Sequence, residues 1–162
     1  KGDANYFKLP KPIFKRGGCN LSFAGLKTAV LQISKKLRKQ EEKYHLAASF
    51  QKTINEILYE KTKVAMDQFL RDKKTKKNTF VIAGGVASNQ SIRKNLTELA
   101  KKKNFDPIFP PKNLCSDNAA MIAWAGIERY KINLINDLDF LSRARWPLDE
   151  TAPFLKGAGL KL

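Results

Sequence analysis

The fold is decided by residues 80–89, Phe80-Val81-Ile82-Ala83-Gly84-Gly85-Val86-Ala87-Ser88-Asn89, where an apolar run stops at a glycine pair and a helix is expected to follow. Further along, Cys115-Ser116-Asp117-Asn118-Ala119-Ala120-Met121-Ile122-Ala123 places an acidic residue at the start of another expected helix. Glycine has no side chain to keep a ligand from the backbone, and a helix N-terminus directs free N–H groups toward it. Together the two segments predict a nucleotide-type pocket with a carboxylate positioned to join it.

Around these segments, the pattern predicts a strand–helix–strand–helix unit, with strands over 79–83 and 107–109 and helices over 88–102 and 116–130. Ile92, Leu96 and Leu99 should point inward. A right-handed crossover makes the two strands parallel, so the fold class is α/β. Because two short strands are too few for a stable sheet, we expect the rest of the sheet to lie outside this chain.

Before this unit, two neighbouring helices are expected over residues 21–39 and 41–71, because apolar residues recur there at three- and four-residue spacing. The stripe of the first helix is Phe23, Leu26, Val30, Ile33 and Leu37. The buried face of the second is Leu46, Phe50, Ile54, Ile57 or Leu58, Val64 or Ala65, and Phe69. We expect a single lobe made of an extended segment (1–19), a helical subregion (20–77), an α/β pocket unit (78–131) and a tail (132–162).

The composition bounds the class of protein. The 162 residues are 43% apolar, which is enough for the core of one domain or one lobe, and no stretch resembles a membrane span or a signal peptide. The chain starts at Lys1 without an initiator Met, so we expect it to be a fragment or a processed product. Cys19 and Cys115 make no disulfide framework and are expected to be reduced thiols of a cytoplasmic protein.

The net charge of +16 favours a polyanionic partner, with nucleic acid first. Basic runs occur at residues 35–39, 71–77 and 101–103. Each falls near an expected helix end, where cations favour the helix dipole, so each run is also compatible with a solvated helix terminus.

Two interpretations stand for each candidate site residue. Gly84 and Gly85 either admit an adenosine or phosphate to the backbone or only form a tight turn. The Asn89 amide can donate to and accept from a ligand, or cap the following helix. Asp117 either caps its helix or supplies one oxygen to a metal. His45, the only histidine, has no ligand-like neighbour and is expected to serve packing.

Four segments in this order resemble one family: Leu21-Ser22-Phe23-Ala24-Gly25-Leu26-Lys27-Thr28-Ala29, Ala48-Ser49-Phe50-Gln51, residues 83–89 and residues 115–123. Their order and spacing are similar to the C-terminal half of the TsaD/OSGEP family of tRNA threonylcarbamoyltransferases, formerly called O-sialoglycoprotein endopeptidases. The ending Arg145-Trp146-Pro147-Leu148-Asp149 resembles the bacterial and mitochondrial branch.

The resemblance implies the C-terminal lobe of an actin-like ATPase (ASKHA) fold, the superfamily of sugar kinases and heat-shock chaperones. Gly84 and Gly85 then line the adenosine pocket, Asn89 contacts the substrate and Asp117 binds a metal. The family's two metal-binding histidines and its phosphate-side glycine loop belong to the N-terminal lobe, which this chain lacks. No catalytic residue is identified in this lobe, and the fragment alone should be inactive.

The resemblance also implies the reaction, an acyl transfer from threonylcarbamoyl-AMP to the N6 amine of the adenosine beside the tRNA anticodon. It implies one divalent metal ion, iron or zinc, and threonylcarbamoyl-AMP or an ATP-like nucleotide as ligand. The implied partners are tRNA and, in bacteria, a TsaB-like paralogue and a TsaE-like ATPase, with no membrane.

Two other functions remain open from the sequence. One is the metal-dependent glycoprotein endopeptidase of the older family label, although the His-Glu-x-x-His helix of zinc proteases is not in the sequence. The other is a non-catalytic basic RNA-binding module that keeps the fold without the active site.

Overall fold

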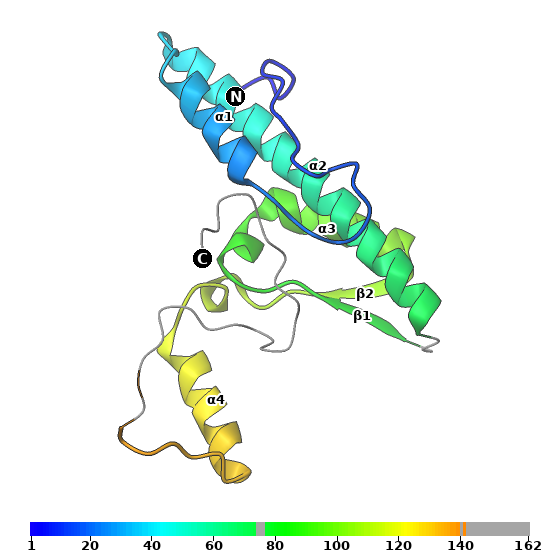
Figure 1. The fold of residues 1–162 in the computed structure, drawn as a ribbon, viewed down its shortest axis with the longest axis vertical. Coiled ribbons are helices and arrows are strands. Elements are labelled where there is room, and N and C mark those ends of the chain that lie inside the picture. The colour runs from blue at the N-terminus through cyan, green and yellow to red at the C-terminus, as the bar shows by residue number, and fades with distance from the viewer. Residues whose placement is uncertain (74–76, 140, 142–162) are drawn as a thin grey trace. The chain divides into compact units, whose positions relative to one another are not determined.

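The computed structural model describes residues 1–73, 77–139 and 141. These form two compact units, with unit 1 from Lys1 to Met121 and unit 2 beginning at Ile122. The elements are α1 (Ala24–Ser34), α2 (Gln40–Asp72), β1 (Asn78–Val81), the 3-10 helix η1 (Gly85–Ser88), α3 (Gln90–Lys102), β2 (Phe105–Ile108), the 3-10 helix η2 (Lys112–Leu114) and α4 (Ala119–Lys131) (Figure 1). None of the helices within the described ranges is long and apolar enough to cross a membrane.

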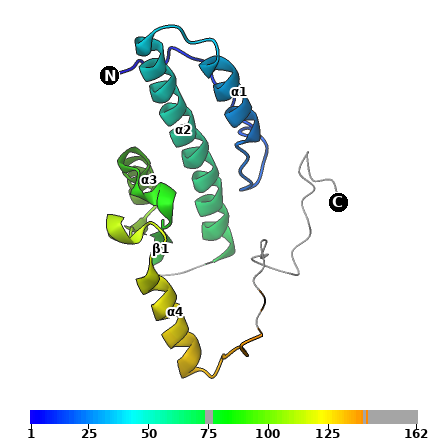
Figure 2. The same ribbon diagram turned by 90° about the vertical axis from the view of Figure 1, so that its left-hand side faces the viewer.

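The long helix α2 organises unit 1, and α1 lies beside it in both ribbon views (Figures 1 and 2). The first core cluster forms between them from Leu9, Leu26, Leu46 and Ile57, with the half-buried side chains of Val30, Ile33 and Leu37 packed against it. The predicted apolar stripe is therefore confirmed from Leu26 to Leu37, whereas Phe23 precedes α1 and is 36% exposed.

The helix α1 ends at Ser34, earlier than the predicted residue 39, because the chain has to turn before α2. The backbone N–H of Lys36 donates to the Ile33 carbonyl at 2.8 Å, which closes the last turn. Two later N–H groups, of Arg38 and Lys39, donate to the Glu42 carboxylate at 2.8 and 2.9 Å. These two hydrogen bonds, of which the one from Lys39 has the larger effect, hold the pKa of Glu42 below its ordinary value. They also fix the start of α2.

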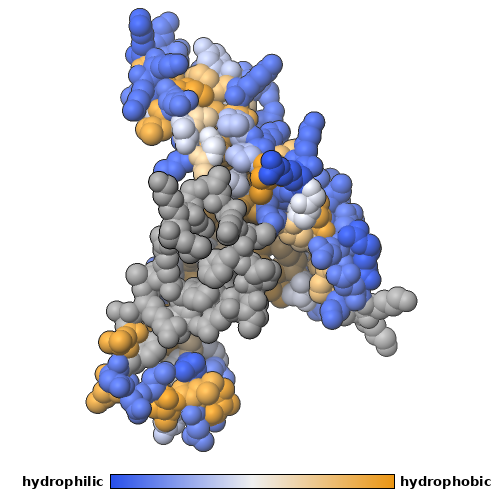
Figure 3. All heavy atoms as spheres, viewed as in Figure 1, coloured by the Kyte–Doolittle hydropathy of each residue, from blue (hydrophilic) through white to orange (hydrophobic). Residues whose placement is uncertain are grey.

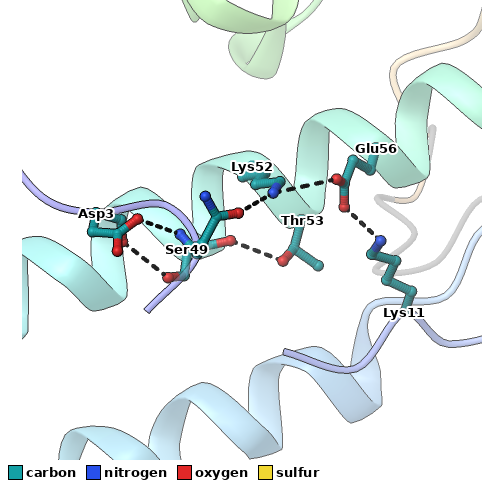
Figure 4. Close-up of polar contacts among 7 residues, drawn as sticks. Asp3, Lys11, Ser49, Lys52, Thr53 and Glu56 are labelled. Carbon is teal, nitrogen blue, oxygen red and sulfur yellow. Dashed lines mark hydrogen bonds and ion pairs between the residues drawn. The ribbon is translucent and has the colours of Figure 1, made fainter. Parts of the chain in front are cut away.

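Polar side chains of α2 hold the N-terminal segment in place (Figure 4). The Ser49 hydroxyl accepts from the Phe7 N–H at 3.1 Å and donates to the Asp3 carbonyl at 3.4 Å. One turn later the Thr53 hydroxyl donates to the Ser49 carbonyl at 2.8 Å. Both side chains are buried, and their hydrogen bonds offset the cost of burying them. The apolar pattern of α2 did not anticipate them.

Two lysine side chains extend this attachment along α2. Lys11 pairs with Glu56 at 2.6 Å, as Figure 4 shows. Lys61, which is only 3% exposed, donates from Nζ to the carbonyl oxygens of Arg16 at 2.7 Å and Gly18 at 3.2 Å. A lysine at a core position of α2 thus anchors the loop that precedes α1.

The second core cluster lies between α2, α3 and the sheet. Its buried members are Met66, Ile92, Leu96, Leu99, Ala100 and Phe105, so the predicted inward face of α3 is confirmed. The strands β1 and β2 pair in parallel, as predicted, with Asn78 opposite Phe105 and Val81 opposite Ile108. Both strands begin and end earlier than predicted. For β2 the reason is that Phe105 joins the core directly after the turn that follows α3, in which Asn104 has φ 57°.

Two aromatic residues predicted on the buried face of α2 are exposed. Phe50 and Phe69 are each 39% exposed. The Phe50 ring lines an open cavity, and the Phe69 ring leans on Phe105 with the ring centroids 5.7 Å apart. The prediction that both are core residues is wrong, because helical periodicity marks the apolar face but not what covers each position along it.

The helix α4 begins at Ala119, and none of its side chains is buried among the described residues. The packing partner expected for its small residues stays a prediction. The tail motif at residues 143–149, on which the branch assignment depends, lies outside the described residues.

Candidate functional site

The turn after β1 gives the two glycines different roles. Gly84 has φ 84° and ψ 174°, a backbone conformation that is essentially restricted to glycine. Gly85 starts η1, and its φ is not positive. A Cβ built on either residue would meet no atom within 4 Å. Gly84 is therefore needed for the backbone, whereas Gly85 keeps bare backbone next to open space.

Asn89 caps α3 and also faces α2. Its side-chain oxygen accepts from the Ile92 N–H at 3.1 Å, and its Nδ2 donates to Oε1 of Gln51 at 2.7 Å. The capping interpretation is thus confirmed. An asparagine amide has two donor hydrogens and two acceptor lone pairs, so one of each is left for a ligand. The helix α3 begins at Gln90, later than predicted, because η1 occupies residues 85–88.

A cavity of about 650 Å³ lies against this turn. Its walls are mostly apolar and include Phe23, Phe50, Ile54, Leu58, Val86 and Ile92. Gly85, Asn89 and Gln51 also line it and supply polar groups. The cavity therefore brings together residues from three of the four motifs found in the sequence, at positions 21–29, 48–51 and 83–89. An apolar hollow with a few convergent polar groups is the usual form of a small-molecule site.

Arg93 connects this turn to the fourth motif. Its Nε donates to the Ala87 carbonyl in η1, and its Nη2 lies 2.8 Å from the Pro110 carbonyl and 3.1 Å from Sγ of Cys115. The guanidinium also lies 4.9 Å from the centre of the Phe109 ring. One half-buried side chain thus fixes the glycine turn against the segment that leads to Asp117. Arg93 is not among the residues predicted from the sequence, because no motif marks an arginine one turn inside a helix.

Asp117 is exposed and does not cap α4. The cap is Asn118, whose side-chain oxygen accepts from the Met121 N–H at 3.0 Å and whose Nδ2 donates to the Ser116 carbonyl at 2.9 Å. The capping interpretation of Asp117 is therefore wrong, because the next residue already satisfies the helix terminus. No hydrogen bond or ion pair joins the Asp117 carboxylate to another described residue, which leaves it available as a hard oxygen donor.

Asp117 fits a metal site only as one of several ligands. The described residues contain no group of three or more histidine, cysteine, aspartate or glutamate side chains able to hold a metal ion. His45 serves packing, as predicted, since its Nδ1 accepts from the Asp3 N–H at 2.8 Å and its ring stacks on Tyr6 with the centroids 4.4 Å apart. Cys19 and Cys115 are free, also as predicted.

Comparison with known proteins gives one consistent match. The sequence model of TsaD, described as tRNA N6-adenosine threonylcarbamoyltransferase, matches residues 1–124. Over 162 residues the chain is 60% identical to the tRNA N6-adenosine threonylcarbamoyltransferase of Pelagibacter ubique (strain HTCC1062), covering 100% of this chain and 45% of that protein. The proteins of the same name from Rhodospirillum rubrum and Rickettsia massiliae are 44% and 46% identical over 163 and 153 residues, covering 98% and 92% of this chain.

The chain spans less than half the length of these relatives, 45% of the Rhodospirillum rubrum protein and 44% of the Rickettsia massiliae protein. The matched range 1–124 includes the glycine turn, Asn89 and Asp117.

Proposed function

Since the chain belongs to the TsaD family, we propose that it is the C-terminal lobe of a tRNA N6-adenosine threonylcarbamoyltransferase with an actin-like ATPase fold. Its α/β unit with two parallel strands is compatible with such a lobe. The partner lobe would lie in the part of the relatives that this chain does not span. On this proposal the described residues form one side of the active site.

The proposed reaction is an acyl transfer. The N6 amine of the adenosine beside the anticodon attacks the carbamoyl carbon of threonylcarbamoyl-AMP. A C–N bond forms, the bond between that carbon and the phosphate oxygen breaks, AMP leaves and the amine gives up one proton. Such a reaction depends mainly on holding donor and acceptor in line, so a binding lobe without its own general base can serve it.

The cavity beside the glycine turn is the proposed place for the donor. Its apolar walls suit the flat face of a nucleoside, and Asn89 offers one free donor and one free acceptor to its polar edge. At Gly85 a phosphate or ribose can approach the backbone without a side chain in the way.

Asp117 is proposed as one ligand of a divalent metal ion, iron or zinc, with the remaining ligands outside the described residues. When bound, the ion would polarise the activated acyl group of the donor. The role of Asp117 is to supply one carboxylate oxygen, and Arg93 holds the preceding Cys115 in place through its 3.1 Å contact.

The proposed acceptor is tRNA, bound by its phosphates. The exposed residues Lys35, Lys36, Arg38 and Lys39 gather where α1 meets α2, at the end of unit 1 where Figure 3 shows hydrophilic side chains. Lysines and arginines that contact phosphates release counterions, so binding should weaken steeply with salt. A TsaB-like paralogue and a TsaE-like ATPase are the proposed protein partners, and the cytoplasm is the proposed location.

The observation that carries this proposal is the convergence of motifs. Three motifs share one cavity, and Arg93 joins the fourth to the same turn. The proteins that match the chain are named as transferases, and nothing in the described residues favours the peptidase alternative.

The test is a transfer assay with the complete protein that carries this chain, supplied with its partner proteins, tRNA, ATP, bicarbonate and labelled threonine. We expect labelled threonylcarbamoyladenosine in the tRNA and at least about a tenfold loss of transfer in Asn89→Ser, since serine keeps the helix cap but not the amide. The matched control is Asn113→Ser, an exposed asparagine in η2. No labelled tRNA from the complete wild-type protein would contradict the proposal.

A further inference from the structure

A chain of side-chain amides connects Asn89 to α2. Asn89 Nδ2 donates to Gln51 Oε1 at 2.7 Å, Gln51 Nε2 donates to Asn55 Oδ1 at 3.1 Å, and Asn55 Nδ2 donates to the Ser91 hydroxyl at 2.8 Å. This series of hydrogen bonds starts at Asn89, the cap of α3, and returns to α3 at Ser91. Gln51 and Asn55 lie one turn apart on α2, so both can face the same end of α3. Asn95 adds a bond from Nδ2 to the Asn55 carbonyl at 2.9 Å.

These contacts fix the Asn89 amide at both ends. Its oxygen is held by the Ile92 N–H, and one Nδ2 hydrogen is held by Gln51. If the Ile92 N–H were its only partner, the amide plane could still rotate about the hydrogen bond between that N–H and the Asn89 oxygen. The second contact, from a different helix, sets that plane and therefore the direction of the remaining Nδ2 hydrogen. Asn89 and Gln51 both line the cavity beside the glycine turn, where this hydrogen is available to a ligand.

We propose that Gln51 is a positioning residue, whose side-chain carbonyl orients the Asn89 amide for binding the acyl donor. This proposal rests on the proposed function of the cavity. Gln51 acts through Asn89 and is given no role at the reacting atoms. The free Nδ2 hydrogen of Asn89 would then already point toward a bound donor. The Asn89 side chain would therefore lose less rotational freedom when the donor binds.

The proposal also gives a role to Gln51, the last residue of the motif Ala48-Ser49-Phe50-Gln51. Ser49 is buried and holds the N-terminal segment, while Phe50 faces the cavity. Gln51, on the next position of the helix, reaches Asn89. Consecutive residues of one helical turn thus serve the fold, the cavity wall and the orientation of a site residue.

The experiment uses the complete protein with three variants. Gln51→Met keeps the length of the side chain and removes its acceptor. Gln51→Glu keeps an oxygen that can accept from Asn89. Gln40→Met is the matched control, because Gln40 is an exposed glutamine at the start of the same helix.

The first readout separates KM for the donor from kcat. We expect Gln51→Met to raise KM about tenfold with kcat within about twofold, because the loss falls on donor binding. Gln51→Glu should recover KM to within about threefold of wild type, and Gln40→Met should match wild type. An unchanged KM in Gln51→Met, or no recovery in Gln51→Glu, would overturn the proposal.

The second readout does not depend on activity. In protein labelled at asparagine side chains, one Nδ2 hydrogen of Asn89 should exchange with water more slowly than the other, and Gln51→Met should abolish the difference. Equal exchange in the wild type contradicts the role of Gln51 whatever the enzyme does. Retained exchange asymmetry with no transfer by the wild type would instead count against the proposed function alone.

Discussion

Replacing each glycine of the turn by alanine should change stability differently, because the two residues differ in backbone conformation. Gly84, at φ 84° and ψ 174°, lies where a Cβ is strained, so Gly84→Ala should cost about 1–3 kcal/mol of local stability. Gly85 has no positive φ, and a Cβ there would meet nothing within 4 Å, so Gly85→Ala should be neutral or stabilise by up to about 1 kcal/mol.

The stability arm of this prediction is measured by hydrogen exchange on the complete protein. The amides to follow are those of Ala87, which donates to the Gly84 carbonyl at 2.9 Å, and Asn89, which donates to the Val86 carbonyl at 3.1 Å. A loss of about 1–3 kcal/mol lowers their protection roughly 5- to 150-fold in Gly84→Ala. In Gly85→Ala their protection should not fall.

The binding arm is measured by calorimetry with a non-hydrolysable analogue of the adenylate donor. If the donor approaches the backbone at Gly85, the added methyl group occupies that space, and affinity should fall by about tenfold or more although the fold is intact. Wild-type affinity in Gly85→Ala would refute the role assigned to bare backbone at this turn. Unchanged protection in Gly84→Ala would refute the strain argument.

Further predictions concern the contacts that support the site. Arg93→Met should cost about 2–4 kcal/mol of local stability, because it removes charged hydrogen bonds to η1 and to the segment before Asp117. Hydrogen exchange of the Leu114 and Cys115 amides should therefore become faster. Equal exchange rates in Arg93→Met and in the control Lys94→Met, an exposed neighbour, would count against this. Glu42, whose folded pKa is lowered below 4.5, stabilises the start of α2 at higher pH and loses this effect as pH falls through its folded pKa. The amide shifts of Arg38 and Lys39 should follow that titration, and the same titration in Glu42→Gln would exclude Glu42 as its source. Lys61→Met should free the loop that its Nζ holds, so that trypsin cleaves after Arg16 about tenfold faster; an unchanged cleavage rate would show that the loop is held by other contacts.

Much of unit 1 could be predicted because its signals are local. The apolar spacing of Ile92, Leu96 and Leu99 gives the inward face of α3, and the crossover between two strands gives their parallel pairing. Those features depend on periodicity and chirality, which a single sequence carries. The ends of the helices are predicted less accurately than their faces. They depend on capping side chains such as those of Glu42 and Asn118, whose partners become clear only in three dimensions.

The candidate site shows the same division. The sequence singles out Gly84, Gly85 and Asn89, because an expected strand is followed directly by a glycine pair and then by a polar residue. Gln51 and Arg93 could not be given their roles, because each acts on a residue that another element supplies. Phe50 was assigned to the core on its apolar character, and the structure places it on a cavity wall instead.

The central claim is that Asp117 belongs to a metal site shared with the glycine turn at Gly84 and Gly85. Its most direct test is the metal content of the complete protein carrying Asp117→Asn. The control is Asp106→Asn, another exposed aspartate of unit 1, which pairs with Lys77 at 3.5 Å. We predict that Asp117→Asn loses its iron or zinc while its circular dichroism stays that of the wild type, and that Asp106→Asn keeps the metal. Full metal content in Asp117→Asn would contradict the account.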